Sequence, residues 1–176
     1  MIHIYFGDGK GKTTAAVGQG IRASGLGSRV IMVQFQKSMR TGEIEYLKLA
    51  GWCSGINLKV IRPETVKGFF CEMSAEDKDL LKKEDEQAIG MISGIISNKE
   101  CDMLILDEIL GSVRNGMLTD DHILKIMESC GDGPELLLTG REASEKNLEA
   151  ADYITEMKMI RHPFIKGVKA SKGIEF

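Results

Sequence analysis

The chain has 176 residues, of which 43% are hydrophobic and 28% are charged, and this composition suits one globular domain with a sizeable core. Its formal net charge of -3 argues against a nucleic-acid partner, because binding a phosphate backbone normally requires a basic face. No apolar run approaches the length of a membrane span and the N-terminus shows no signal-peptide pattern, so we expect a cytoplasmic protein with no membrane partner.

The first fourteen residues, MIHIYFGDGKGKTT, change from a short apolar run to glycines and end in Gly-Lys-Thr. This order is typical of a strand, a phosphate-binding loop and a helix. Three glycines would let the backbone turn and direct N–H groups at phosphate oxygens, namely Gly7, Gly9 and Gly11. Lys12 would add a positive charge, and Thr13 would supply a hydroxyl for Mg²⁺.

The spacing of this loop departs from the usual G-x-x-x-x-G-K-[ST] pattern. Phe6 stands where that pattern has its first glycine, and Gly7 leaves only three residues before Gly11. A glycine-rich turn with a surface lysine is the alternative interpretation. The strand before the loop and the helix after it favour a nucleotide site.

Strands and helices are expected to alternate along the rest of the chain. Helices are predicted over about 12–25, 41–49, 74–98, 119–129 and 143–150, and strands over 29–35, 56–61, 103–108, 135–141 and 153–159. The glycine-rich tail after Arg161 is expected to be loop. This alternation predicts an α/β fold, with an open, largely parallel sheet of about six strands and helices on both faces, in one RecA-like P-loop nucleotide-binding domain over 1–176.

Several polar residues follow the predicted strands, at the edge where open parallel sheets bind their ligands. Asp107 and Glu108 close one strand, and we expect Asp107 to face a metal ion. Lys37 and Arg141 follow two other strands, and each could bind phosphate or be an ordinary surface charge. Glu43 is expected to make a favourable contact with the N-terminus of its helix.

The cysteines and histidines are scattered, so a zinc site has little support and free thiols are expected. The aromatic pair Phe69 and Phe70 lies in a connecting segment. These side chains could pack on the core or line an apolar ligand pocket.

The assembled motifs resemble one family over nearly the whole chain, the P-loop type ATP:corrinoid adenosyltransferases (cob(I)yrinic acid a,c-diamide adenosyltransferases). The matching segments follow the family's order: 7–16, 22–23, 33–37, 42–43, 106–109, 138–141, 151–157, 161–163, 167–170 and 173–175. The resemblance implies that the 5′-deoxyadenosyl group of ATP is transferred to the Co(I) centre of a corrinoid, with release of triphosphate. The corrinoid would be cobalamin or its a,c-diamide precursor, in cobalamin biosynthesis or salvage.

The resemblance also implies which residues form the site. ATP and corrinoid would be bound by Gly7, Asp8, Gly9, Lys10, Gly11, Lys12, Thr13, Thr14, Arg22, Lys37, Arg141, Phe69 and His162. Phe69 would be the aromatic residue that excludes the lower axial ligand of cobalt. Mg²⁺ or Mn²⁺ would be held by Thr13 with Asp107 or Glu108, and catalysis would involve Lys12, Thr13 and Glu108.

The resemblance further implies a homodimer and a flavoprotein reductase as partners. The chain departs from the family's pattern in three places. Cys71 stands where the best-known members carry tryptophan, and we expect it to be a small apolar filler. No helix precedes the first strand, so we expect a more open site or a lid from 62–73 or the C-terminal tail. The segment 109–116 lacks the tyrosines often seen there.

Two other functions are compatible with the predicted phosphate loop. A RecA-like or kinase-like P-loop ATPase or phosphotransferase would release ADP, and Glu108 would then be a candidate base for water. A nucleotide-dependent binding module that delivers finished cofactor would bind both ligands without turnover.

Overall fold

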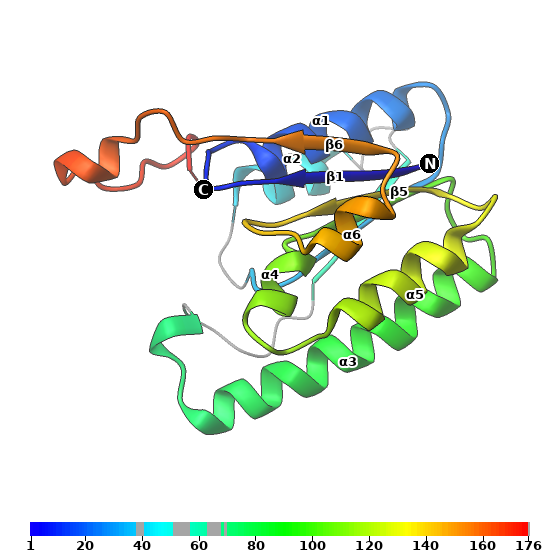
Figure 1. Cartoon of the computed structure of the whole chain (residues 1–176). Coiled ribbons are helices and arrows are strands. Elements are labelled where there is room, and N and C mark those ends of the chain that lie inside the picture. Colours follow the sequence, from blue (N-terminus) through cyan, green and yellow to red (C-terminus); the bar gives the residue numbers. More distant parts are fainter. Residues whose placement is uncertain (38–40, 51–56, 63–67, 69, 176) are drawn as a thin grey trace.

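The protein is a three-layer α/β structure, shown in the computed structural model of Figure 1. The structure describes residues 1–175 apart from 38–40, 51–56, 63–67 and 69. Its sheet has six strands in the order β3-β2-β4-β5-β1-β6. The strands are β1 (Ile2–Phe6), β2 (Val30–Gln34), β3 (Leu58–Ile61), β4 (Met103–Asp107), β5 (Glu135–Thr139) and β6 (Tyr153–Glu156). Every neighbouring pair is parallel, which confirms the predicted sheet.

Helices cover both faces of this sheet, as a parallel sheet requires. Figure 1 shows α1 (Lys12–Gly25) and α2 (Gly42–Ala50) on one face. The opposite face carries α3 (Ala75–Ser97), α4 (Ile109–Arg114), α5 (Asp120–Cys130) and α6 (Glu145–Glu149). Among the described helices, none is both long and apolar enough to cross a membrane.

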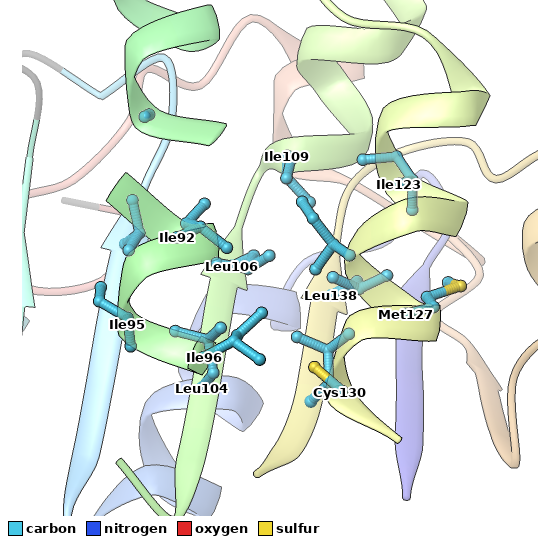
Figure 2. Packing of buried hydrophobic residues seen from close by; sticks show 14 of the residues in the cluster. Ile92, Ile95, Ile96, Leu104, Leu106, Ile109, Ile123, Met127, Cys130 and Leu138 are labelled. Carbon is cyan, nitrogen blue, oxygen red and sulfur yellow. The ribbon is translucent and has the colours of Figure 1, made fainter. Parts of the chain in front are cut away.

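The larger part of the core lies between the sheet and the helices α3, α4 and α5 (Figure 2). Leu104 and Leu106 of β4 face this layer, whereas Ile105 between them faces α1 on the other side of the sheet. All three side chains are fully buried, so β4 is apolar on both faces, as its unbroken apolar run predicted. A Cβ atom on Gly20 of α1 would lie only 2.9 Å from the side chains of Ile105 and Leu58, so this glycine lets α1 approach the sheet closely.

Two helices begin as the sequence predicted. Ser74 caps α3 through a capping box with Asp77, and Thr119 caps α5 through the equivalent pair with His122. Each cap satisfies backbone N–H groups that the first helical turn leaves unpaired.

Three local features differ from the prediction. The helix α4 was not predicted, because its six residues are too few to show a helical period. The last strand ends at Glu156, three residues before its expected end. The tail was expected to be loop throughout, but Pro163–Lys166 forms a short 3₁₀ helix, since proline is favourable at a first helical position.

Candidate functional site

A loop of tightly packed glycines joins β1 to α1. The N–H of Gly7 donates to Arg141 O at 3.0 Å, and the N–H of Gly9 donates to Met157 O at 2.6 Å. A Cβ atom on Gly9 would lie 2.6 Å from the same oxygen, and Gly7 and Gly11 have φ of 114° and 115°. The glycines therefore allow the loop to pack closely against the segments that follow β5 and β6. This packing could not be read from the sequence. The N–H groups available to an anion are those of the first turn of α1.

Lys12 folds back over this loop. Its Nζ atom donates to Gly7 O at 2.6 Å and to Gly9 O at 2.7 Å. Burial lowers the pKa of Lys12, and Arg141 lowers it further, whereas the Glu108 carboxylate raises it. The ammonium group thus lies at the centre of the loop, where the sequence predicted a positive charge for phosphate.

The buried carboxylate of Asp107 connects the loop to the ends of three strands. Its Oδ1 atom accepts hydrogen bonds from Thr13 Oγ1 at 3.0 Å and Thr139 Oγ1 at 2.7 Å. Its Oδ2 atom accepts from Gln34 Nε2 at 3.0 Å and forms an ion pair with Lys37 Nζ at 2.5 Å. Asp107 is fully buried, and these donors compensate for the loss of water around its charge.

Lys37 contacts both oxygens that the sequence assigned to a metal ion. Besides its ion pair with Asp107, its Nζ atom donates to Thr13 Oγ1 at 2.7 Å. The position of the ammonium group shows that the hydroxyl and the carboxylate together suit a cation. Oxygen ligands of this kind are those that Mg²⁺ prefers, and it usually takes its remaining ligands from water and substrate phosphates. In the described part of the chain, no group of three or more His, Cys, Asp or Glu side chains could hold a metal ion alone.

Two residues that sequence reasoning missed extend this cluster. Gln34 Oε1 accepts a hydrogen bond from Arg62 Nε at 2.7 Å, and Arg62 also donates to Thr41 Oγ1 at 2.8 Å. Gln34 could have been noticed as the polar residue that ends a buried apolar strand. Arg62 carries no such signal, because its role depends on the pairing of β3 with β2.

Glu108 begins α4 in a left-handed backbone conformation, with φ of 61°. Such a conformation costs a non-glycine residue about 1–3 kcal/mol, and residues that adopt it cluster at functional sites. Its N–H donates to Thr139 Oγ1 at 2.8 Å, and a Cβ atom on Gly111 would lie 2.8 Å from Glu108 Oε1. Burial raises the pKa of Glu108, and the neighbouring Asp107 raises it further.

A cavity of about 750 Å³ opens beside this cluster. Four of the predicted site residues line it, namely Thr13, Thr14, Lys37 and Arg141. Glu43 lines it too, in the first turn of α2 as expected. The C-terminal tail also lines it, through Ala170, Gly173, Ile174 and Glu175, and Gly68 contributes as well. The cavity is large enough for a nucleotide, and both segments expected to form a lid reach it.

The remaining predicted residues lie elsewhere. Asp8 accepts a hydrogen bond from the N–H of Met159 at 2.8 Å, so its carboxylate is used to hold the segment after β6. Lys10 is exposed on the loop, Arg22 is exposed in the last turn of α1, and His162 precedes the 3₁₀ helix of the tail. None of these four lines the cavity. Phe69 lies outside the described residues.

Among the described cysteines, Cys71, Cys101 and Cys130 are free thiols, as predicted. The expectation that Cys71 is an apolar filler was wrong, because Cys71 is exposed on the short 3₁₀ helix Phe70–Glu72.

Comparison with known proteins identifies relatives over the whole chain. Residues 1–176 match the family model described as ATP:corrinoid adenosyltransferase BtuR/CobO/CobP. A corrinoid adenosyltransferase of Pseudomonas aeruginosa is 31% identical over all of this chain and 83% of its own length. Proteins of the same name from Sinorhizobium sp and Escherichia coli K12 are 32% and 30% identical over all of this chain, and over 80% and 85% of their own lengths.

Proposed function

Because the chain belongs to the ATP:corrinoid adenosyltransferase family, which transfers the adenosyl group of ATP to the cobalt of a corrinoid, we propose that its phosphate loop holds the leaving triphosphate. One observation carries this proposal. Thr13 of the loop and the cation Lys37 line a nucleotide-sized cavity, and both contact the buried carboxylate of the strand-end residue Asp107.

The transfer makes unusual demands on a phosphate loop. A reduced cobalt centre attacks the 5′ carbon of ATP, the bond from that carbon to the α-phosphate oxygen breaks, and the triphosphate leaves whole. The nucleophile carries no proton that must be removed, so no general base is needed. Negative charge develops on the leaving group, and groups that stabilise this charge accelerate the reaction.

Lys12 of the phosphate loop and two cations that line the cavity can meet that demand. Lys12 would exchange its contacts with the loop carbonyls of Gly7 and Gly9 for contacts with phosphate oxygens. Lys37 and Arg141 line the cavity and can contact the same triphosphate. The free N–H groups of the first turn of α1 add the positive end of the helix dipole. Each of these groups interacts more strongly with the leaving triphosphate than with bound ATP.

Thr13 and Asp107 would hold Mg²⁺, with Glu108 as a further carboxylate next to them. The ion would neutralise part of the triphosphate charge. Lys37 would then move from the oxygen pair toward the phosphates, since two cations cannot share one carboxylate oxygen without repulsion.

We also propose that the whole chain, 1–176, is one P-loop domain and acts as a cytoplasmic homodimer with a flavoprotein reductase that supplies the reduced cobalt. The sequence resemblance supports the homodimer and the reductase, and the length and composition of the chain support a single domain. Exposed apolar side chains after β6, including Ile160 at 86% and Ile165 at 74% exposure, offer surface for a subunit contact.

Analysis of the phosphate product tests the proposed function against the two alternatives. We expect inorganic triphosphate when ATP and Mg²⁺ are incubated anaerobically with a Co(I) corrinoid, and no ADP without the corrinoid. Release of ADP without corrinoid would instead support a phosphotransferase with Glu108 as base. Binding of both substrates without any product would support a delivery module.

A further inference from the structure

Arg62 follows β3 directly, and its half-buried guanidinium group joins two parts of the candidate site. Its Nε atom donates to Gln34 Oε1 at 2.7 Å, at the end of the neighbouring strand β2. Its Nη2 atom donates to Thr41 Oγ1 at 2.8 Å, and Thr41 lines the cavity directly before α2. Arg62 is not among the described residues that line the cavity, so it reaches a bound ligand through these neighbours.

Arg62 fixes the orientation of the Gln34 carboxamide. A guanidinium group has only donors, so the oxygen of Gln34 must face Arg62. The Asp107 carboxylate in its ion pair with Lys37 has only acceptors, so the nitrogen of Gln34 must face it, at 3.0 Å. Gln34 is fully buried, and no water replaces a partner that it loses. The carboxamide is therefore held in one orientation, with a donor directed at Asp107.

Thr139 has the same relationship to the other oxygen of Asp107. Its Oγ1 atom accepts from the N–H of Glu108 at 2.8 Å and donates to Asp107 Oδ1 at 2.7 Å. Each oxygen of Asp107 thus receives a hydrogen bond from a neutral group whose direction is set by a further donor. For Thr139 that further donor is a backbone N–H, whereas for Gln34 it is the side chain of Arg62.

The donor on Oδ2 becomes more important when the cation site is filled. In the proposed function, Mg²⁺ takes the oxygens of Thr13 and Asp107, and Lys37 moves to the phosphates. Gln34 then remains on Oδ2 after the ammonium group has left. Residues that orient a metal ligand in this way typically raise metal affinity or activity about 10–100-fold. Without Arg62, the carboxamide could turn its oxygen toward Asp107 and repel the carboxylate.

We propose that Arg62 is a positioning residue for adenosyl transfer, which through Gln34 holds the Asp107 carboxylate in the orientation that binds Mg²⁺ beside Thr13. The proposal rests on the proposed function, because that function includes the metal ion. Arg62 differs in this respect from Arg141, which lines the cavity and can contact phosphate itself. Loss of Arg62 should therefore affect the binding of ATP with Mg²⁺ and spare the binding of metal-free ATP.

The test compares Arg62→Met, Gln34→Met and their double variant with the parent enzyme. Arg29→Met is the matched control, because Arg29 precedes β2 and pairs with Asp102 before β4, at the opposite end of the same two strands. Calorimetry gives the Kd for ATP with Mg²⁺ and with a chelator, and their ratio is the gain in affinity due to the metal ion. Initial rates give kcat and the Mg²⁺ concentration for half-maximal transfer, and thermal melting reports stability.

We expect Arg62→Met to reduce the gain due to Mg²⁺ about tenfold, and to change the Kd for metal-free ATP less than about twofold. The Mg²⁺ concentration for half-maximal transfer should rise by about the same factor, with most of kcat restored at saturating Mg²⁺. Gln34→Met should give a similar loss, and the double variant should be no worse than Gln34→Met alone. Arg29→Met should lower the melting temperature and leave the gain due to Mg²⁺ unchanged.

Three results would overturn the proposal. They are a normal response of Arg62→Met to Mg²⁺, equal losses of ATP affinity with and without Mg²⁺, and losses in the two single variants that multiply in the double variant. If Arg62→Met does not melt cooperatively, Arg62→Lys takes its place, because lysine keeps the charge but has one nitrogen for the two oxygens of Gln34 and Thr41. Its gain due to Mg²⁺ should fall at least about threefold, and a normal gain would overturn the proposal.

Transfer by the parent enzyme is assayed in the same reactions. If the parent forms no cobalt–carbon bond, the proposed function fails. The calorimetric comparison of ATP with and without Mg²⁺ then still decides on Arg62, since it needs no corrinoid.

Discussion

Thr13 Oγ1 lies 3.0 Å from Asp107 Oδ1, although 94 residues separate them in the sequence. The contact forms because β4 lies next to β2 with Asp107 paired to Gln34, and α1 packs against β4. A hydroxyl at the start of a helix is thus brought to a carboxylate at the end of a strand. This pair is the proposed Mg²⁺ site, and it leads to the first prediction.

Replacement of Thr13 by valine removes the hydroxyl and keeps the side-chain volume. We expect Thr13→Val to weaken ATP binding in the presence of Mg²⁺ about tenfold to a hundredfold, and to leave metal-free binding nearly unchanged. Calorimetric titration of ATP with and without Mg²⁺ measures both values. Thr13→Ser keeps the hydroxyl and should behave like the parent enzyme. Equal losses of ATP affinity with and without Mg²⁺ would instead indicate that Thr13 binds phosphate directly.

Replacement of Lys12 by alanine removes the charge at the centre of the loop. We expect Lys12→Ala to weaken ATP binding and to lower kcat for transfer by about a hundredfold or more, since charge on the leaving triphosphate is then poorly stabilised. Lys10→Ala is the comparison, because Lys10 is exposed on the same loop. We expect it to change ATP binding and kcat less than Lys12→Ala does. Normal transfer by Lys12→Ala would remove this lysine from the mechanism.

The effect of a substitution at Glu108 distinguishes the transfer mechanism from a hydrolytic one. If no proton has to be removed, Glu108→Gln should lower turnover only through weaker metal binding, and a higher Mg²⁺ concentration should restore most of the rate. Rate measurements over a range of Mg²⁺ concentrations test this expectation. A loss of about a hundredfold or more that Mg²⁺ does not restore would indicate a general base.

The buried Asp85 should make stability depend on pH. Desolvation raises its pKa from the ordinary value of 3.8 to about 6, and Glu84 contributes to the increase while Ser112 opposes it. The folded protein therefore binds the Asp85 proton more tightly than the unfolded chain does, so its free energy of unfolding falls as the pH rises from 4 through about 6. The difference between the two pKa values corresponds to a fall of roughly 3 kcal/mol in the free energy of unfolding.

Urea denaturation of the parent protein and Asp85→Asn between pH 4 and pH 8 measures this effect. The free energy of unfolding of the parent should fall relative to that of the variant across this interval and then stay level. A constant difference at all pH values would mean that Asp85 titrates normally.

The parts of the fold that were predicted from sequence are those with local causes. The apolar run of β4 and the capping residues of α3 each act within a few neighbouring residues, so their effect is visible in the sequence. The proposed roles of Thr13 and Asp107 were inferred from signals of the same local kind, since Thr13 belongs to the glycine loop and Asp107 ends an apolar strand.

The contacts that were not predicted depend on the pairing of distant segments. Arg62 reaches Gln34 only because β3 lies next to β2 in one particular register. Gln36 meets Ser112 only because the unpredicted helix α4 follows β4 without a loop. No local pattern marks these residues as partners, and their charge and polarity alone suggest ordinary surface positions.

The central claim is that the triphosphate of ATP leaves whole, held by the phosphate loop. It is tested most directly with the ATP analogue whose β and γ phosphates are joined by nitrogen, supplied at saturating concentration with Mg²⁺ and a Co(I) corrinoid under anaerobic conditions. Because no bond between phosphates breaks in the proposed reaction, we expect the analogue to support cobalt adenosylation at a rate close to that of ATP and to release imidotriphosphate. Failure to form the cobalt–carbon bond with this bound analogue, while ATP reacts normally, would contradict the account.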